Sequence, residues 1–132
     1  MTLQEAILRA DRMRPNTVPH IEKVAWVNHL EADIYELMAV NTAGYDASWR
    51  TCSCCDGCSS CDNAAECIGL MMPAPYDVIY PLYLAAMIDN YQEEVQLYQN
   101  DMEIANAAIA DAKAWWRRTH RQNSSKYYFR GL

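Results

Sequence analysis

The helical pattern through residues 73–120 constrains the fold of this chain more than any other feature. Apolar residues recur there at steps of three and four, which is the spacing that places side chains along one face of an α-helix. Two successive series of such residues predict helical structure over most of the stretch. They comprise Tyr80, Leu84, Met87, Ile88, Tyr91, Val95 and Tyr98, and then Ile104, Ala105, Ala108, Ile109, Ala112, Trp115 and Trp116.

Two groups of polar residues set the expected bounds of these helices. Asp77 precedes the first series, where its carboxylate can accept hydrogen bonds from backbone N–H groups of the first turn. The triplet Gln99-Asn100-Asp101 separates the first series from the second. We therefore predict helices at 77–98 and 101–120, either antiparallel or continuous. The alanines of the second helix allow a neighbouring helix to approach closely.

The first forty residues predict two further helices. Thr2 and Glu5 have the spacing of a capping box at a helix start. Pro15 ends this first helix, and Pro19 suits the first position of the next one. The second helix is about 20 residues long, with its apolar residues on one face. These apolar residues are Val24, Val27, Leu30, Ile34, Leu37 and Met38.

Together these elements predict an all-α fold. A chain of 132 residues is long enough for one hydrophobic core but not for two. We expect a small four-helix domain over residues 1–121, with a long cysteine-rich loop at 42–72 between the second and third helices. An extended C-terminal tail follows at 122–132. The start of the chain has no signal-peptide pattern, and the apolar stretch near 82–88 is too short to span a bilayer.

No group of residues in the sequence has the pattern of a catalytic site. Glu22, Glu31, Asp33 and Glu36 cluster on the second predicted helix, but no nucleophile or histidine is placed beside them. We expect these four carboxylates to form a solvated helix face. The chain also has no glycine-rich phosphate loop, no Ser/His/Asp spacing and no metalloprotease motif. We therefore predict that this protein is not an enzyme.

All six cysteines lie within residues 52–67, inside the predicted loop. Cys52, Cys55, Cys58 and Cys61 follow one another at Cys-x-x-Cys spacing, and thiolates at that spacing can bind one tetrahedral zinc ion. In a reducing cytosol, clustered cysteines are more often metal ligands than disulfides. These pairs overlap, however, whereas a usual structural zinc site separates two pairs by a spacer. Zinc, disulfides formed after cell lysis and free thiols therefore all stay open.

The charge of the chain is divided unevenly between its C-terminal end and the rest. From Lys113 onward there are six basic residues and no acidic one, whereas the other 112 residues hold five basic and seventeen acidic groups. A basic end on an acidic body suits contact with an acidic protein surface or with DNA. Arginines in a last helical turn also complement the helix dipole without any partner. The candidate partner-binding residues are Arg117, Arg118, Arg121, Lys126, Tyr127, Tyr128, Phe129 and Arg130.

Several of these residues stand in an order that resembles the head–tail connector (adaptor) proteins of long-tailed bacteriophages. The resemblance covers about residues 20–40 and 73–121, and it does not extend to the cysteine-rich residues 42–72. Its N-terminal part is Lys23 and Trp26, followed by Leu30, Ile34 and Leu37. Its C-terminal part is Pro75-Tyr76-Asp77, Tyr80, Tyr83-Leu84, Ile88-Asp89, Tyr98-Gln99-Asn100 and Trp115-Trp116-Arg117-Arg118-Thr119-His120.

The resemblance implies a structural protein of the virion that is synthesised in the host cytoplasm. It implies a ring of copies of this chain, a dodecamer, attached below the portal protein. Such a ring extends the channel for genomic DNA, which passes without sequence-specific binding, and it offers a platform for the next neck or tail protein. On this interpretation the acidic body faces the channel, and the C-terminal tail engages the portal or a neighbouring subunit.

Two other classes of protein stay open. A zinc-stabilised interaction module of the cytosol would use residues 52–67 to bind its partner. A small DNA-binding protein would use the basic residues that follow Trp116, but the strongly acidic remainder of the chain disfavours this class.

Overall fold

The structure is a computed structural model that describes residues 1–40 and 69–120. Within these two ranges the protein consists of four α-helices and no β-strand, which confirms the predicted all-α fold. The predicted loop and tail lie largely outside the described residues. The helices are α1 (Leu3–Met13), α2 (His20–Tyr35), α4 (Ile79–Tyr91) and α5 (Val95–Thr119), with a π-helical turn at Glu36–Val40 and a 3-10 turn at Tyr76–Val78.

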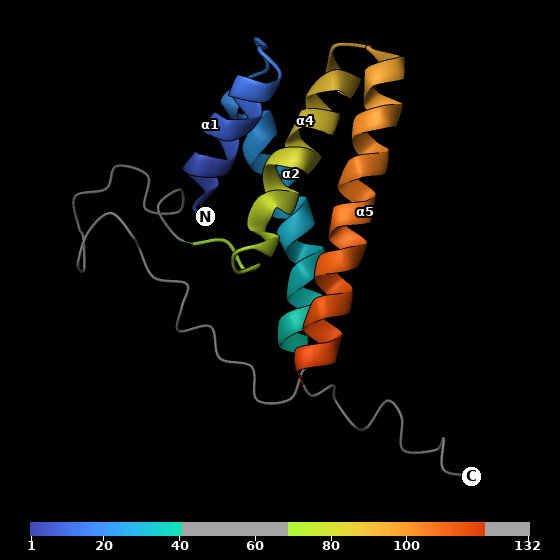
Figure 1. Cartoon of the computed structure of the whole chain (residues 1–132). Helices are drawn as coiled ribbons and strands as arrows, with labels where there is room; N and C mark the ends of the chain where they lie inside the picture. Colours follow the sequence, from blue (N-terminus) through green and yellow to red (C-terminus); the bar gives the residue numbers. More distant parts are fainter. Residues whose placement is uncertain (41–68, 121–132) are drawn as a thin grey trace, which may run out of the picture.

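Helix α4 is the centre of the bundle. It lies between α1 and α5, and α2 packs across it on a third side (Figure 1). Most of the α4 side chains are therefore buried, including Tyr80, Leu84 and Ile88. α5 runs antiparallel to α4 over the whole length of α4. The buried alanines of α5, Ala105 and Ala112, allow the close approach that the sequence predicts.

The break between α4 and α5 lies earlier than predicted. α4 ends at Tyr91 and α5 begins at Val95, so the predicted helix at 77–98 is wrong at its C-terminal end. The turn is made by Glu93, whose φ of 60° places it in the left-handed region. As a result, Tyr91 is 51% exposed and Val95 is 64% exposed, and neither belongs to the core face. The triplet that contains Asn100 lies inside α5.

The helix starts agree only partly with the predicted caps. The Glu5 backbone N–H donates to Thr2 Oγ1 at 3.2 Å, which confirms Thr2 as the cap of α1. Asp77, in contrast, does not cap α4, because that helix starts two residues later, at Ile79, and its N-cap is Val78, which makes no side-chain cap hydrogen bond. The Asp77 carboxylate lies 3.4 Å from the amino group of Met1 instead. Pro81 occupies the first turn of α4, where its missing N–H leaves no helical hydrogen bond unmade.

Glu31 is buried, so the expectation of a solvated carboxylate is wrong at this position. Its carboxylate accepts hydrogen bonds from the Met71 backbone N–H, at 3.2 Å to each oxygen, and from the Tyr80 hydroxyl. The same hydroxyl accepts a hydrogen bond from the Met72 N–H at 2.9 Å. α2, α4 and residues 69–72 are therefore joined by one buried polar network.

The chain re-enters the described structure beside its own N-terminus. Gly69 forms a β-bridge with Thr2, and the Leu70 N–H donates to the Met1 carbonyl at 2.9 Å. Within the described ranges, no helix combines the length and the apolar composition that crossing a bilayer requires.

Candidate partner-binding end of the bundle

The C-terminal ends of α2 and α5 lie side by side at the end of the bundle opposite the α4–α5 turn (Figure 1). We call this the basic end, defined by Lys113, Arg117 and Arg118 of α5. Lys113 and Arg117 are one helical turn apart and therefore share a face of α5, which is turned toward α2. The predicted partner-binding residues Arg117 and Arg118 are both exposed here, in the last turn of the helix.

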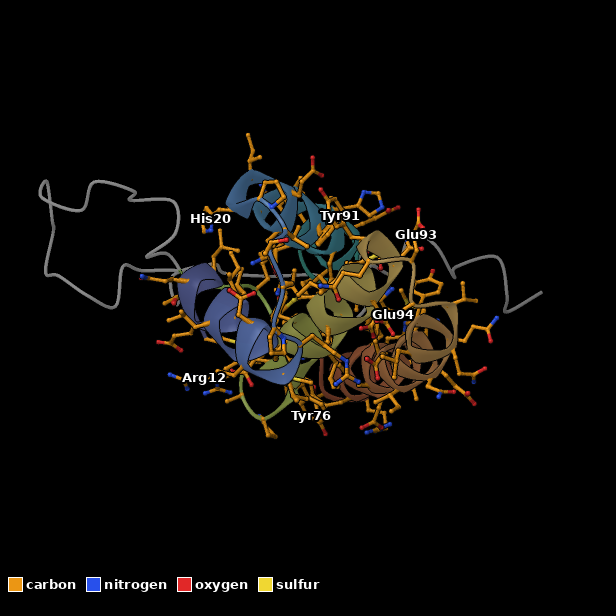
Figure 2. The ribbon with its side chains drawn as sticks, turned by 90° about the horizontal axis from the view of Figure 1, so that it is seen from above. Arg12, His20, Tyr76, Tyr91, Glu93 and Glu94 are labelled. Carbon is orange, nitrogen blue, oxygen red and sulfur yellow. The ribbon has the colours of Figure 1, made fainter. Side chains whose placement is uncertain are left out.

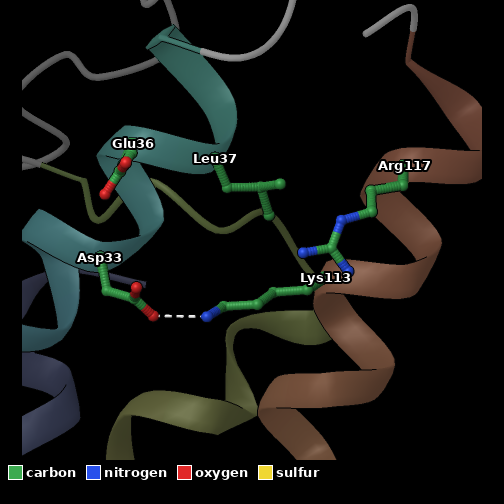
Figure 3. Close-up of a pocket in the computed structure, with 5 residues that line it drawn as sticks. All are labelled: Asp33, Glu36, Leu37, Lys113 and Arg117. Atoms are coloured by element: carbon green, nitrogen blue, oxygen red, sulfur yellow. Dashed lines mark hydrogen bonds and ion pairs between the residues drawn. The ribbon is translucent and has the colours of Figure 1, made fainter. Parts of the chain in front are cut away.

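A small open pocket lies between the two helices at the basic end. Asp33, Glu36 and Leu37 line it from the α2 side, and Lys113 and Arg117 line it from α5 (Figure 3). Its volume is about 120 Å³, which suits one side chain better than a cofactor. The pocket is therefore small and is lined mostly by charged side chains.

The charges in this pocket are only partly paired. Lys113 forms an ion pair with Asp33, which joins α5 to α2 (Figure 3). No residue of the described ranges forms an ion pair with Arg117 or Glu36. The guanidinium of Arg117 is thus available to a carboxylate from another molecule, and such a planar pair allows two parallel hydrogen bonds.

A cluster of aromatic rings supports the last turn of α5. Trp116 is buried, and the His120 ring stacks on it at a centroid distance of 3.3 Å. Trp115 stacks on Tyr76 at 4.6 Å, which links α5 to the 3-10 turn before α4. The Thr119 hydroxyl donates to the Trp115 carbonyl at 2.9 Å. These contacts hold the backbone that positions Arg117.

The other predicted site residues lie outside the described residues. This applies to the candidate zinc ligands Cys52, Cys55, Cys58 and Cys61. It applies equally to the rest of the basic and aromatic set, which is Arg121, Lys126, Tyr127, Tyr128, Phe129 and Arg130. In the part of the chain that the structure describes, no three His, Cys, Asp or Glu side chains gather as metal ligands would. Zinc binding at residues 52–67 stays a prediction.

A second polar cluster lies near the opposite end of the bundle, where Arg14 joins α1 to α5. The Arg14 guanidinium donates to Asp101 Oδ2 from Nε at 3.1 Å and from a terminal nitrogen at 2.8 Å. Asp89 of α4 lies beneath this pair and is 1% exposed, with its Oδ1 3.3 Å from Arg14 Nε. Since that N–H points to Asp101, neither Asp89 oxygen accepts a hydrogen bond from the described residues.

The environment of Asp89 disfavours its charged form. Burial, followed by the neighbouring Asp101 carboxylate, raises the pKa of Asp89 to about 6, and the attraction of Arg14 offsets this only in part. At neutral pH the protein thus holds a buried carboxylate with an incomplete set of partners, which costs stability.

We expect the stability of the protein to depend on pH through Asp89. Since its folded-state pKa of about 6 exceeds the usual 3.8, the folded state binds this proton more tightly than the unfolded state. The contribution of Asp89 to the free energy of unfolding therefore falls as the pH rises between those values.

Asp89→Asn is expected to remove this decline and to raise the melting temperature, relative to wild type, above pH 6. Thermal unfolding from pH 4 to pH 8 measures the difference, with exposed Asp111→Asn as the control. Parallel profiles for wild type and Asp89→Asn would contradict the prediction.

Sequence reasoning missed the pocket at the basic end. Asp33 and Lys113 are 80 positions apart, so no local pattern joins them. A weaker signal was present, since Asp33 and Leu37 are four residues apart on one helix, as are Lys113 and Arg117 on another. That spacing shows which residues share a face, but not that the two faces meet.

No family model, curated protein or solved structure matches this chain. A function therefore has to be argued from the residues of the chain and from the geometry of the basic end.

Proposed function

We propose that this chain is a structural protein of a bacteriophage virion, a head–tail connector (adaptor) that forms a ring below the portal. The observation that carries the proposal is the order of residues that resembles the connector family, because many of them have structural roles in the bundle. Tyr76 stacks on Trp115, the Tyr80 hydroxyl donates a hydrogen bond to Glu31, and Trp116 is buried near the C-terminal end of α5. The resemblance thus includes residues that join α5 to the 3-10 turn before α4 and α4 to α2.

The basic end supports a role in binding an adjacent protein of the neck. Arg117 and Arg118 are exposed at the point where the chain continues into the basic and aromatic residues 121–132. Tyr and Arg are enriched in protein–protein interfaces and among the few residues that dominate the binding energy there. In the proposed ring this end contacts the portal or a neighbouring subunit, and the downstream neck or tail protein binds elsewhere on the ring.

The exposed acidic residues support passage of DNA without binding. Glu22, Glu93 and Glu94 are exposed and form no ion pair with the described residues. Carboxylates facing a channel repel the DNA phosphates, so the duplex slides instead of adhering. The same excess of acidic groups disfavours a role as a DNA-binding protein.

The proposal is tested by the copy number of this protein in purified phage particles. Quantitative mass spectrometry against the portal and major capsid proteins is expected to give one copy per portal subunit, because a connector ring matches the symmetry of the portal ring. The major capsid protein serves as the internal standard for intact particles. Absence of the chain from particles would overturn the connector function.

The cysteine run favours one alternative, a zinc-stabilised interaction module of the cytosol. Cys52, Cys55, Cys58 and Cys61 have the spacing of zinc ligands, and four thiolates would leave the metal no open position for catalysis. This function predicts stoichiometric zinc in the purified protein and loss of partner binding on chelation. Zinc-free protein that still enters particles favours the connector.

A further inference from the structure

Two helix faces on opposite sides of the bundle lack a partner within the described structure. Helix α1 lies on one side of α4 and α5 lies on the other (Figure 1), and the view along the bundle shows Arg12 of α1 far from Glu94 at the start of α5 (Figure 2). We define the α1 face as Leu8, Arg9, Arg12 and Met13, and the α5 face as Leu97, Glu103, Ile104 and Asp111.

Each face combines exposed apolar side chains with unpaired charge. On the α1 face, Leu8 is 48% exposed beside Arg9 and Arg12. On the α5 face, Ile104 is 54% exposed beside Glu103. None of these three charged side chains forms an ion pair with another described residue. The two faces therefore match in apolar content and are opposite in charge.

The contact between Arg14 and Asp101 shows which residues of the two faces lie at the same height along the bundle. Arg14, just after α1, donates to Asp101 of α5 at 2.8 Å, so the heights of these two positions differ by no more than the reach of an arginine side chain. α1 and α5 run in opposite directions (Figure 1), and each rises about 1.5 Å per residue. Arg12 lies two residues before Arg14 and Glu103 two residues after Asp101, so Arg12 and Glu103 lie within about one helical turn of the same height.

Counting back from Arg14 and forward from Asp101 in the same way shows which apolar residues of the two faces lie at similar heights. Leu8 is six residues before Arg14 and comes level with Ala107, within one helical turn of Ile104. Arg9 comes within one turn of Glu103. Glu5 comes level with Ala110, next to Asp111, so the two carboxylates at the lower end of the contact repel each other and oppose docking there.

We propose that the α1 face of one copy of this chain docks on the α5 face of a second copy, with Arg12 opposite Glu103 and Leu8 against Ile104. Copies that stand side by side around an axis parallel to the helices keep their heights, so the charges that are level within one chain meet between two chains. The two faces are different surfaces on opposite sides of the subunit. Such a heterologous contact repeats from copy to copy and closes into a ring when the rotation allows.

This inference rests on the proposed ring and identifies the surfaces that form it. The contact places oppositely charged side chains around an apolar centre, as in other specific interfaces. It also leaves the basic end free, so that Arg117 and the pocket beside it stay available to a different partner. Lateral assembly and attachment to the neck thus use separate surfaces.

The test is a charge-reversal exchange on the full-length chain. Sedimentation equilibrium at up to about 1 mM protein measures self-association of wild type, Arg12→Glu, Glu103→Arg and the double variant. Each single reversal is expected to weaken association at least about tenfold, because it replaces an attraction with a repulsion across the contact. The double variant is expected to associate like wild type, since the reversed pair is again complementary. Glu22→Arg and Glu93→Arg make the same charge change as Glu103→Arg at exposed positions outside both faces and are expected to have no such effect.

Three results would overturn the proposal. These are a wild-type chain that is monomeric throughout the range, single reversals that behave like the control variants, and a double variant that does not recover. The connector function is judged separately, by the copy number in particles. If the chain is present in particles but its self-association does not change with the reversals, the connector function stands and this contact is wrong. If the chain is absent from particles but its self-association changes as expected, this contact stands and the connector function is wrong.

Discussion

Replacement of Tyr80 by phenylalanine is expected to lower the free energy of unfolding by about 3 kcal/mol, since it removes the hydrogen-bond acceptor of the buried Met72 N–H and one donor to the buried Glu31 carboxylate. The Tyr80 hydroxyl donates to the Glu31 carboxylate and accepts from the Met72 N–H at 2.9 Å. Phenylalanine fills nearly the same volume, so the loss comes from hydrogen bonding and not from packing. Urea denaturation followed by circular dichroism measures the difference between the variant and wild type.

Tyr91→Phe is the matched control for this change, because it removes a tyrosine hydroxyl from the same helix at a position that is half exposed. We expect this variant to stay within about 0.5 kcal/mol of wild type. If the two variants were equally stable, the hydrogen bonds of the Tyr80 hydroxyl would contribute nothing to the stability of the fold.

Replacement of Trp116 by alanine is expected to cost about 4 kcal/mol, which is typical of a large aromatic side chain removed from a core. Trp116 is 4% exposed near the C-terminal end of α5, and its ring carries the stacked ring of His120. The variant therefore loses buried area, leaves a cavity and releases His120. Chemical denaturation monitored by circular dichroism measures the loss, since the signal of the helices does not depend on the deleted ring.

Arg118→Ala, two residues further along α5 and exposed, is the control for the Trp116 change. It removes a long side chain from the same last turn without opening the core, so its expected cost is below about 1 kcal/mol. A cost as small as this for Trp116→Ala would mean that the end of α5 frays in solution and does not position Arg117.

The helices could be predicted from the sequence where local signals mark their ends. Thr2 caps α1 and Pro15 stops it, and both act within one turn of the chain. The α4–α5 turn could not be placed in this way. The steps of three and four continue from Tyr91 to Val95 across the turn, and Glu93 adopts the left-handed conformation without the glycine that usually marks it.

The polar contacts in the interior of the bundle could not be predicted at all. Glu31 reaches Met71 across 40 residues and Tyr80 across 49, and a pattern read along one helix holds no information about either partner. A charge on such a helix is expected in water unless a donor is known to lie opposite. Of the candidate site, the sequence predicted only the two arginines in the last turn of α5. The residues that line the pocket from the α2 side could be identified only from the packing of α2 against α5.

The Glu31 network also joins a distant part of the sequence to the start of the chain. Residues 69–72 are held by Thr2 and Met1 from one side and by Glu31 and Tyr80 from the other. The point at which the chain rejoins the bundle is therefore tied to the N-terminus, α2 and α4 together, so a change at Tyr80 alters this junction as well as the core.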